Sequence, residues 1–226
     1  GIPTIHHTAG LSKAIIAGDW LFVQGYALGG QYNQEIVNNI ATCCSNIAIS
    51  EFTQIDHIQN LKTSPEDYLE IVKGKTAGPF ASGCLSAGIV AGLSTEKAQA
   101  LYNFGLEIGI AYQLVDDLLD LIGDESIGKP VGTDVMEGKM TLPIIHSLTL
   151  SHGKEREILA EIINDFDPSR MSKLTEILEK SESFNYTKIL IKNHLDRAIN
   201  SLEIYPDSPA KDLMRSIAEY STTRKL

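Results

Sequence analysis

The stretch Gly109–Leu121 reads GIAYQLVDDLLDL. On a helix, residues three or four apart share a face, so Gln113, Asp116 and Asp120 line up, with Asp117 beside them. The opposite side is apolar and is expected in the core: Leu114, Leu118, Leu121 and Ile122. The stretch therefore predicts a mostly buried helix from which three carboxylates project.

These carboxylates have two interpretations. On an exposed helix, like charges at i and i+4 cost only about 0.2–0.5 kcal/mol, so a solvated stripe is possible on energy alone. Such a stripe normally mixes Lys with Glu, whereas this one holds only Asp, Gln and Gly. In a partly buried cleft, two charges about 4 Å apart repel by about 4 kcal/mol at an effective dielectric of about 20, and a divalent cation would remove that repulsion. Asp oxygens suit Mg²⁺, which keeps waters and takes phosphate oxygens as further ligands.

Helical periodicity continues along the whole sequence, and no stretch alternates as a strand would. Start signals stand at Thr63–Glu66, with a cap, a proline and an acid, and at Ser94–Lys97. Gly123–Gly138 is expected to be a glycine-rich loop. One all-α domain over residues 1–226 is predicted. Helices are expected at Leu11–Ala27, Gln34–Glu51, Pro65–Thr76 with a continuation to Leu93 disturbed at Gly78–Pro79, Leu101–Leu121, from Thr141 to before Gly153, Lys154–Asp165, Pro168–Ser181, Glu182–Ile204 and Ser208–Ser221.

The composition is that of an ordinary globular protein, with 43% apolar and 21% charged residues among 226. The net charge of −10 argues against nucleic acid as the main partner, because phosphate backbones are held by clustered Lys and Arg. The longest weakly polar run, Gly83–Leu93, is shorter than the about 20 residues that cross a bilayer, so no integral membrane segment is expected. Cys43, Cys44 and Cys84 are expected to be free thiols in a reducing compartment.

Basic residues flank the carboxylate helix on both sides in the sequence. Lys129 and Lys139 lie in the loop that follows it, and Lys75 lies on an earlier helix. The triplet Gly74–Thr76 is not a phosphate-binding P-loop, because Leu69 stands where that motif needs Gly and no strand precedes it. Each lysine alone is typical of a surface charge. Together with the acidic face, the lysines indicate a site that carries both positive and negative charge, which suits a metal-bridged diphosphate.

Four segments resemble the trans-prenyl diphosphate synthases. Tyr112–Asp120 (YQLVDDLLD) resembles the second aspartate-rich motif of that family. The segments 128–134 (GKPVGTD) and Glu137–Pro143 (EGKMTLP) resemble the region that follows that motif. Lys75–Ala77 resembles the Lys-Thr motif. The resemblance extends over essentially the whole chain and implies an all-α, isoprenoid-synthase-type helical bundle.

The resemblance implies a Mg²⁺ site. By position, Asp116 and Asp120 would ligate the metal, Asp117 would lie in the same shell, and Asp134 would hold metal-bound water.

The resemblance also implies two substrates, an allylic diphosphate and isopentenyl diphosphate. Lys75, Lys129 and Lys139 would grip the allylic diphosphate, while Thr76 and Gln113 would border its reacting end. Magnesium and the lysines would stabilise charge as diphosphate leaves. The double bond of isopentenyl diphosphate would then attack the allylic cation, and a proton would be lost.

Within that reaction the resemblance implies Asp116, Lys75 and Gln113 as catalytic residues of a prenyltransferase in isoprenoid biosynthesis. Small residues of the helices would either line a tunnel for the growing tail or serve as helix-packing contacts. A cytoplasmic homodimer is expected by resemblance, with the apolar segment Ala14–Tyr26 as interface or as core.

The start of the sequence departs from the full family pattern. Gly1–His6 (GIPTIH) resembles the stretch just after the first aspartate-rich motif, and that motif is not in this sequence. We therefore expect a bundle that lacks its first helices, and we expect these residues alone to bind metal and diphosphate weakly without elongating a chain. The alternatives are a non-catalytic regulatory or partner subunit, a helical binding module, or a class I terpene cyclase, which would carry a metal motif of Asn, Ser and Glu instead.

Overall fold

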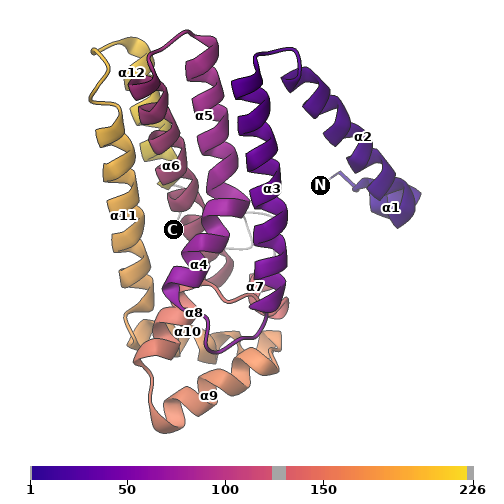
Figure 1. Ribbon diagram of the computed structural model, residues 1–226. Helices are drawn as coiled ribbons and strands as arrows, with labels where there is room; N and C mark the ends of the chain where they lie inside the picture. Colours follow the sequence, from indigo (N-terminus) through magenta and orange to yellow (C-terminus); the bar gives the residue numbers. More distant parts are fainter. Residues whose placement is uncertain (1, 124–130, 223–226) are drawn as a thin grey trace. The chain divides into compact units, whose positions relative to one another are not determined.

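The computed structural model describes residues 2–123 and 131–222 (Figure 1). Every element within those residues is a helix, which confirms the all-α prediction. The elements are α1 Ile5–Ala9, α2 Leu11–Gly29, α3 Gln34–Asp56, α4 Pro65–Val72, the π-helical turn η1 Lys73–Ala77, α5 Gly78–Val90, α6 Thr95–Ile122, α7 Thr133–Met136, α8 Leu142–Leu150, α9 Gly153–Asn164, the 3₁₀ turn η3 Pro168–Arg170, α10 Met171–Lys180, α11 Ser183–Ser201 and α12 Pro209–Thr222.

The chain divides into two compact units, Gly1–Cys44 and Ser45–Leu226. The first unit holds α1, α2 and the first part of α3, and the side chains of α2 are almost all exposed. The second unit holds the main hydrophobic core and all the predicted site residues that the structure describes. A single domain over residues 1–226 stays a prediction.

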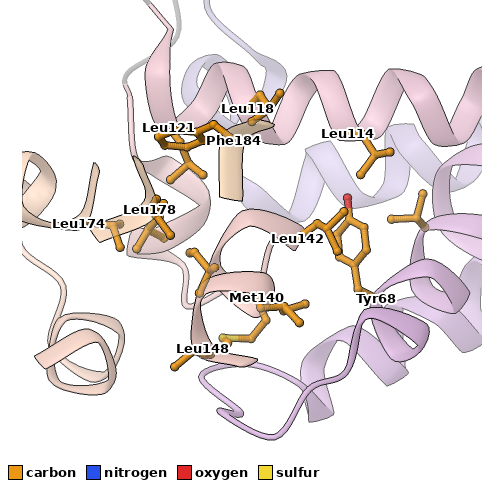
Figure 2. Close-up of a cluster of buried hydrophobic side chains, with 14 of the residues drawn as sticks. Tyr68, Leu114, Leu118, Leu121, Met140, Leu142, Leu148, Leu174, Leu178 and Phe184 are labelled. Carbon is orange, nitrogen blue, oxygen red and sulfur yellow. The ribbon is translucent and has the colours of Figure 1, made fainter. Parts of the chain in front are cut away.

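In the second unit, α6 is the central helix and packs most closely against α5 and α11 (Figure 1). Leu114, Leu118 and Leu121 are buried in the core, as predicted, whereas Ile122 is only half-buried. Figure 2 shows these leucines facing side chains from α8, α10 and α11. Full burial of one leucine side chain contributes about 1.5–3 kcal/mol, so this face of α6 fixes the rotation of the helix and with it the direction of the carboxylates.

The start of α4 follows the predicted signal. Ser64 accepts a hydrogen bond from the Asp67 backbone N–H, and Asp67 accepts one from the Ser64 backbone N–H, which forms a capping box. Pro65 occupies the first turn, where its missing N–H is not needed. These contacts fix the beginning of α4 and therefore the position of Tyr68, one turn further along.

The disturbance expected at Gly78–Pro79 lies earlier, in the π turn Lys73–Ala77. Pro79 cannot donate a hydrogen bond to the Lys75 carbonyl, and its ring would clash with that carbonyl in a regular α-helix. The chain widens instead, and the Gly78 N–H donates to the Lys73 carbonyl five residues back. The predicted place was therefore wrong by a few residues, although the proline remains the cause.

Other predicted boundaries also needed correction. The helix expected at Gln34–Glu51 runs on to Asp56, and the short helix Ile5–Ala9 was not predicted. The expected loop at Gly123–Gly138 contains the helix α7 at Thr133–Met136. The helix expected at Leu101–Leu121 begins six residues earlier, at Thr95, within the start signal at Ser94–Lys97. The remaining helices begin and end within a few residues of the expected positions.

Two glycines allow α6 to contact the backbone of η1 and α5 directly. A Cβ atom added at Gly109 would lie 2.5 Å from Ala77 Cα, and one added at Gly105 would lie 2.6 Å from the Phe80 carbonyl oxygen. At these two positions the small residues serve as helix-packing contacts. This close approach brings Thr76 and Gln113 into hydrogen-bonding distance.

A partly buried ionic group also connects α6 to α11. Glu107 bonds to His194 Nδ1 at 2.6 Å and accepts a hydrogen bond from Arg197 Nε at 2.9 Å. Burial alone would raise the pKa of Glu107, but the hydrogen bonds from His194 and Arg197 outweigh it, so the pKa lies below its ordinary value. The charged form of Glu107 therefore stabilises the packing of the two helices.

Gly105→Ala should lower the free energy of unfolding by about 1–3 kcal/mol, because the new Cβ would meet backbone atoms that cannot move aside. Chemical denaturation measures this. The matched control is Gly83→Ala on α5, where a Cβ would meet no atom within 4 Å, and it should gain about 0.5–1 kcal/mol from helix propensity. Equal effects of the two substitutions would contradict the close packing of α5 on α6.

Glu107→Gln should make the protein less sensitive to acid. Because the pKa of folded Glu107 lies below its unfolded value of 4.5, its stabilisation is present above that pH and is lost as the pH falls further. Denaturation at about pH 7 and about pH 3.5 should show the wild type losing more stability than the variant. An equal loss in both proteins would show that this group does not stabilise the fold.

Candidate functional site

A cavity of about 210 Å³ is lined by the end of α3, by α4, η1, α6 and α7, and by the segment that joins α7 to α8. It gathers seven of the predicted site residues on one surface: Lys75, Thr76, Gln113, Asp116, Asp117, Asp134 and Lys139. Asp120 is not part of the lining, and Lys129 lies outside the described residues. The other lining residues are Gln54, His57, Thr63, Tyr68, Ile71, Val72, Met140 and Thr141.

The acidic face of α6 is not a solvated stripe. Asp117 is 2% exposed and Asp120 is 4% exposed, while Asp116 is half-buried at the cavity. Burial raises the pKa of Asp117 to about 7, against the opposing hydrogen bonds from Tyr68 and Gln113. The solvated interpretation of these carboxylates is therefore wrong.

Asp117 is held by two hydrogen bonds. The Tyr68 hydroxyl donates to Oδ2 at 2.6 Å, and the Gln113 side-chain amide donates to Oδ1 at 2.8 Å. Gln113 in turn accepts a hydrogen bond of 2.9 Å from the Thr76 hydroxyl. Burial, together with Asp117, raises the pKa of Tyr68 well above its usual range, so the hydroxyl remains a donor. These contacts join η1, α4 and α6 through one chain of hydrogen bonds.

Asp120 organises the segment after α6. Its carboxylate accepts hydrogen bonds of 3.1 Å from the backbone N–H groups of Thr133 and Asp134, and its backbone carbonyl accepts one of 2.7 Å from Gly132. Gly132 has φ +82°, a conformation that favours glycine. Through these bonds Asp120 anchors the first turn of α7 and turns Asp134 into the cavity.

Lys75 lies on the π turn and is held from α3. Its ammonium donates hydrogen bonds to Gln54 at 2.7 Å and to Glu51 at 3.1 Å. Glu51 and Gln54 are three residues apart on one face of α3, and sequence reasoning missed both of them. Their spacing places them on one face of α3 but does not connect them with Lys75, which lies 24 and 21 residues further along the chain.

Lys139 lies on the other side of the cavity. It forms ion pairs of 2.7 Å with Asp134 and with Glu137. Burial alone would lower the pKa of Lys139, but the contacts with Asp134 and Glu137 outweigh it and raise the pKa above its usual range, so the side chain stays charged. The cavity therefore carries a fixed positive charge close to its carboxylates.

The carboxylates do not form a complete metal cage by themselves. Within residues 2–123 and 131–222, no group of three or more His, Cys, Asp or Glu side chains lies close enough together to hold a metal ion. Mg²⁺ typically binds through one or two carboxylates, waters and phosphate oxygens of a ligand, and Asp116 and Asp134 line the cavity in a way that fits this. The donor set thus suits a metal that arrives with a phosphorylated ligand.

None of the helices in the described part of the chain combines the length and the apolar character needed to cross a membrane.

Comparison with known proteins places these observations in a family. Residues 1–181 match the family described as polyprenyl synthetase. A short chain isoprenyl diphosphate synthase of Methanothermobacter thermautotrophicus is 32% identical, over 100% of this chain and 71% of that protein. An octaprenyl diphosphate synthase of Haemophilus influenzae is 28% identical, over 99% of this chain and 69% of that protein.

Solved structures of prenyl synthases are similar to this chain in fold. A decaprenyl diphosphate synthase from Rhodobacter capsulatus superimposes with a TM-score of 0.92 at 30% identity, covering 99% of this chain and 70% of that one. A polyprenyl synthase from Caulobacter crescentus, complexed with calcium and isoprenyl diphosphate, superimposes with a TM-score of 0.92 at 28% identity, covering 98% of this chain and 69% of that one.

Proposed function

The chain belongs to the polyprenyl synthetase family, and we propose that its cavity binds Mg²⁺ and an allylic diphosphate for prenyl transfer to isopentenyl diphosphate. The proposal rests on a cavity that is lined by both acidic and basic side chains. Asp116, Asp117 and Asp134 line the same space as Lys75 and Lys139. The relatives are named as diphosphate synthases of several chain lengths, which supports a prenyltransferase over a regulatory subunit or a terpene cyclase.

Asp116 and Asp134 are the carboxylates that we assign to the metal. The Asp117 carboxylate accepts hydrogen bonds from Tyr68 and Gln113, and the Asp120 carboxylate accepts them from the backbone of α7. We therefore assign Asp117 and Asp120 a structural role in maintaining the geometry of the site. When bound, Mg²⁺ would supply Lewis-acid stabilisation of the leaving diphosphate, an effect of several kcal/mol.

The protein's own groups have separate tasks in the reaction. Lys75 and Lys139 hold diphosphate oxygens and stabilise the charge that grows on them as the allylic C–O bond breaks. The electron pair of that bond leaves with diphosphate, the double bond of isopentenyl diphosphate attacks the allylic carbon, and a proton is then lost. Thr76 and Gln113 border the reacting end. By resemblance, Lys129 would add a third cation.

Titration calorimetry with geranylgeranyl diphosphate tests this proposal. The 226-residue chain should bind the ligand only with Mg²⁺ present, and Asp116→Ala should weaken binding by about tenfold or more, because one carboxylate that neutralises the metal is lost. The matched control is Asp196→Ala, an exposed acid on α11, which should bind like the wild type. The proposal would be overturned if the affinity for the ligand did not change when Mg²⁺ is chelated, or if Asp116→Ala bound the ligand as tightly as the wild type.

We also propose that the protein is a homodimer built on α2. This helix has only Lys13 and Asp19 as charged residues, and large apolar side chains on all its sides are exposed. Such an apolar surface on an isolated chain favours association, and the pairing of identical surfaces in a two-fold dimer would cover it. The exposed residues are Leu11, Ile15, Ile16, Trp20, Leu21, Phe22, Val23, Tyr26 and Leu28.

Sedimentation velocity tests the dimer. The wild type should sediment at twice the 24.7 kDa chain mass, and Trp20→Glu should shift it to the single-chain mass, because a charge in an apolar interface is costly to bury. Leu213→Glu, a charge placed at an exposed leucine on α12, is the control and should remain a dimer. A monomeric wild type, or dissociation in both variants, would count against α2 as the interface.

We keep the cytoplasm as the predicted location. The three cysteines are free, which fits a reducing compartment. Some relatives are named as chloroplastic or mitochondrial, so fractionation of the native cell is the direct test.

A further inference from the structure

Tyr68 is a buried residue to which the proposed reaction gives no task. It lies on α4, is 5% exposed, and its ring packs among the apolar side chains of the main core. Figure 2 shows its hydroxyl directed toward α6, the helix that carries Leu114 and Leu118. A phenylalanine would fill the same space, so the hydroxyl needs a separate explanation.

The hydroxyl begins a chain of three hydrogen bonds that ends in the cavity. Tyr68 donates to Asp117 at 2.6 Å, Gln113 donates to the other oxygen of Asp117 at 2.8 Å, and Thr76 donates to the Gln113 carbonyl oxygen at 2.9 Å. Because Asp117 accepts on both oxygens, it holds the NH₂ end of the Gln113 amide toward itself and the carbonyl end toward Thr76.

This direction decides what Thr76 can offer to a ligand. A hydroxyl has one hydrogen, and Thr76 gives it to Gln113, so only its lone pairs are left for a group in the cavity. Oxygen lone pairs at that point favour a positively charged ligand atom over a neutral one. The same pattern would be lost if the amide of Gln113 turned over, because Thr76 could then donate its hydrogen to the ligand.

We propose that Tyr68 is a positioning residue that, through Asp117 and Gln113, turns the lone pairs of Thr76 toward the carbon that becomes positively charged. The inference rests on the proposed function, in which Thr76 and Gln113 border the reacting end of an allylic diphosphate. It adds a residue whose hydroxyl bonds to Asp117 and acts through that carboxylate. Tyr68 acts by fixing the direction of the hydrogen bonds and not by carrying charge itself.

Two ligands separate this role from a purely structural one. The first is geranylgeranyl diphosphate, which is neutral at the reacting carbon. The second is an analogue in which a protonated amine stands where the allylic cation would form. The ratio of their dissociation constants, measured by calorimetry with Mg²⁺ on the 226-residue chain, reports the preference of the site for positive charge. Loss of packing alone would change both affinities together and leave this ratio unchanged.

Tyr68→Phe should reduce the preference for the ammonium ligand by about tenfold, the effect of losing one hydrogen bond to a charged group. Its affinity for geranylgeranyl diphosphate should stay within about twofold, because Lys75, Lys139 and Asp116 are untouched. The matched control is Tyr205→Phe, which removes a hydroxyl that donates to the Lys97 carbonyl at the same distance, 2.6 Å, outside the cavity. The control should keep the wild-type ratio.

The outcomes are distinct. If the wild type binds neither ligand, the proposed function fails. If it binds both and Tyr68→Phe keeps the wild-type ratio, or if Tyr205→Phe loses the ratio equally, the positioning role fails. Should Tyr68→Phe not fold, Asp117→Asn carries the test, because its amide cannot accept from both Tyr68 and Gln113, and the same loss of preference is expected.

Discussion

The site depends on one constraint: three carboxylates project from a helix whose opposite face is the hydrophobic core. The negative charge of each carboxylate must be stabilised by hydrogen-bond donors or cations. Asp117 is compensated by donors from Tyr68 and Gln113, and Asp120 by backbone N–H groups of α7. Asp116 lines the cavity together with Lys75 and Lys139. In the function proposed above, a metal shared with a bound diphosphate would act on Asp116, so the three carboxylates would have separate roles.

The rigid surroundings of α6 follow from the same constraint. Gly105 and Gly109 allow η1 and α5 to contact the backbone of α6, so the π turn that carries Lys75 and Thr76 lies directly against Gln113. Pro79, in the first turn of α5, cannot donate a hydrogen bond to the Lys75 carbonyl, which favours the widened geometry of the preceding π turn. The π turn that carries Lys75 and Thr76 is thereby packed directly against the helix that carries the carboxylates.

Much of this could be predicted from sequence. Helical periodicity, the capping box at Ser64 and the apolar side of Gly109–Leu121 are local signals, and they predicted the helices and the direction of α6. The sequence could not separate Asp117 from Asp116, because their difference comes from Tyr68, forty-nine residues away along the chain. Glu51 and Gln54 were missed for the same reason, since only the folded chain brings α3 against Lys75.

The most direct test of the central claim is a crystal structure with Mn²⁺ and geranylgeranyl diphosphate, in which anomalous scattering locates the metal. We predict Mn²⁺ close to Asp116 and Asp134 together with the diphosphate, with Asp117 still bonded to Tyr68 and Gln113. A metal bound by Asp117 with the Tyr68 hydroxyl released, or a diphosphate held without any metal near α6, would contradict it.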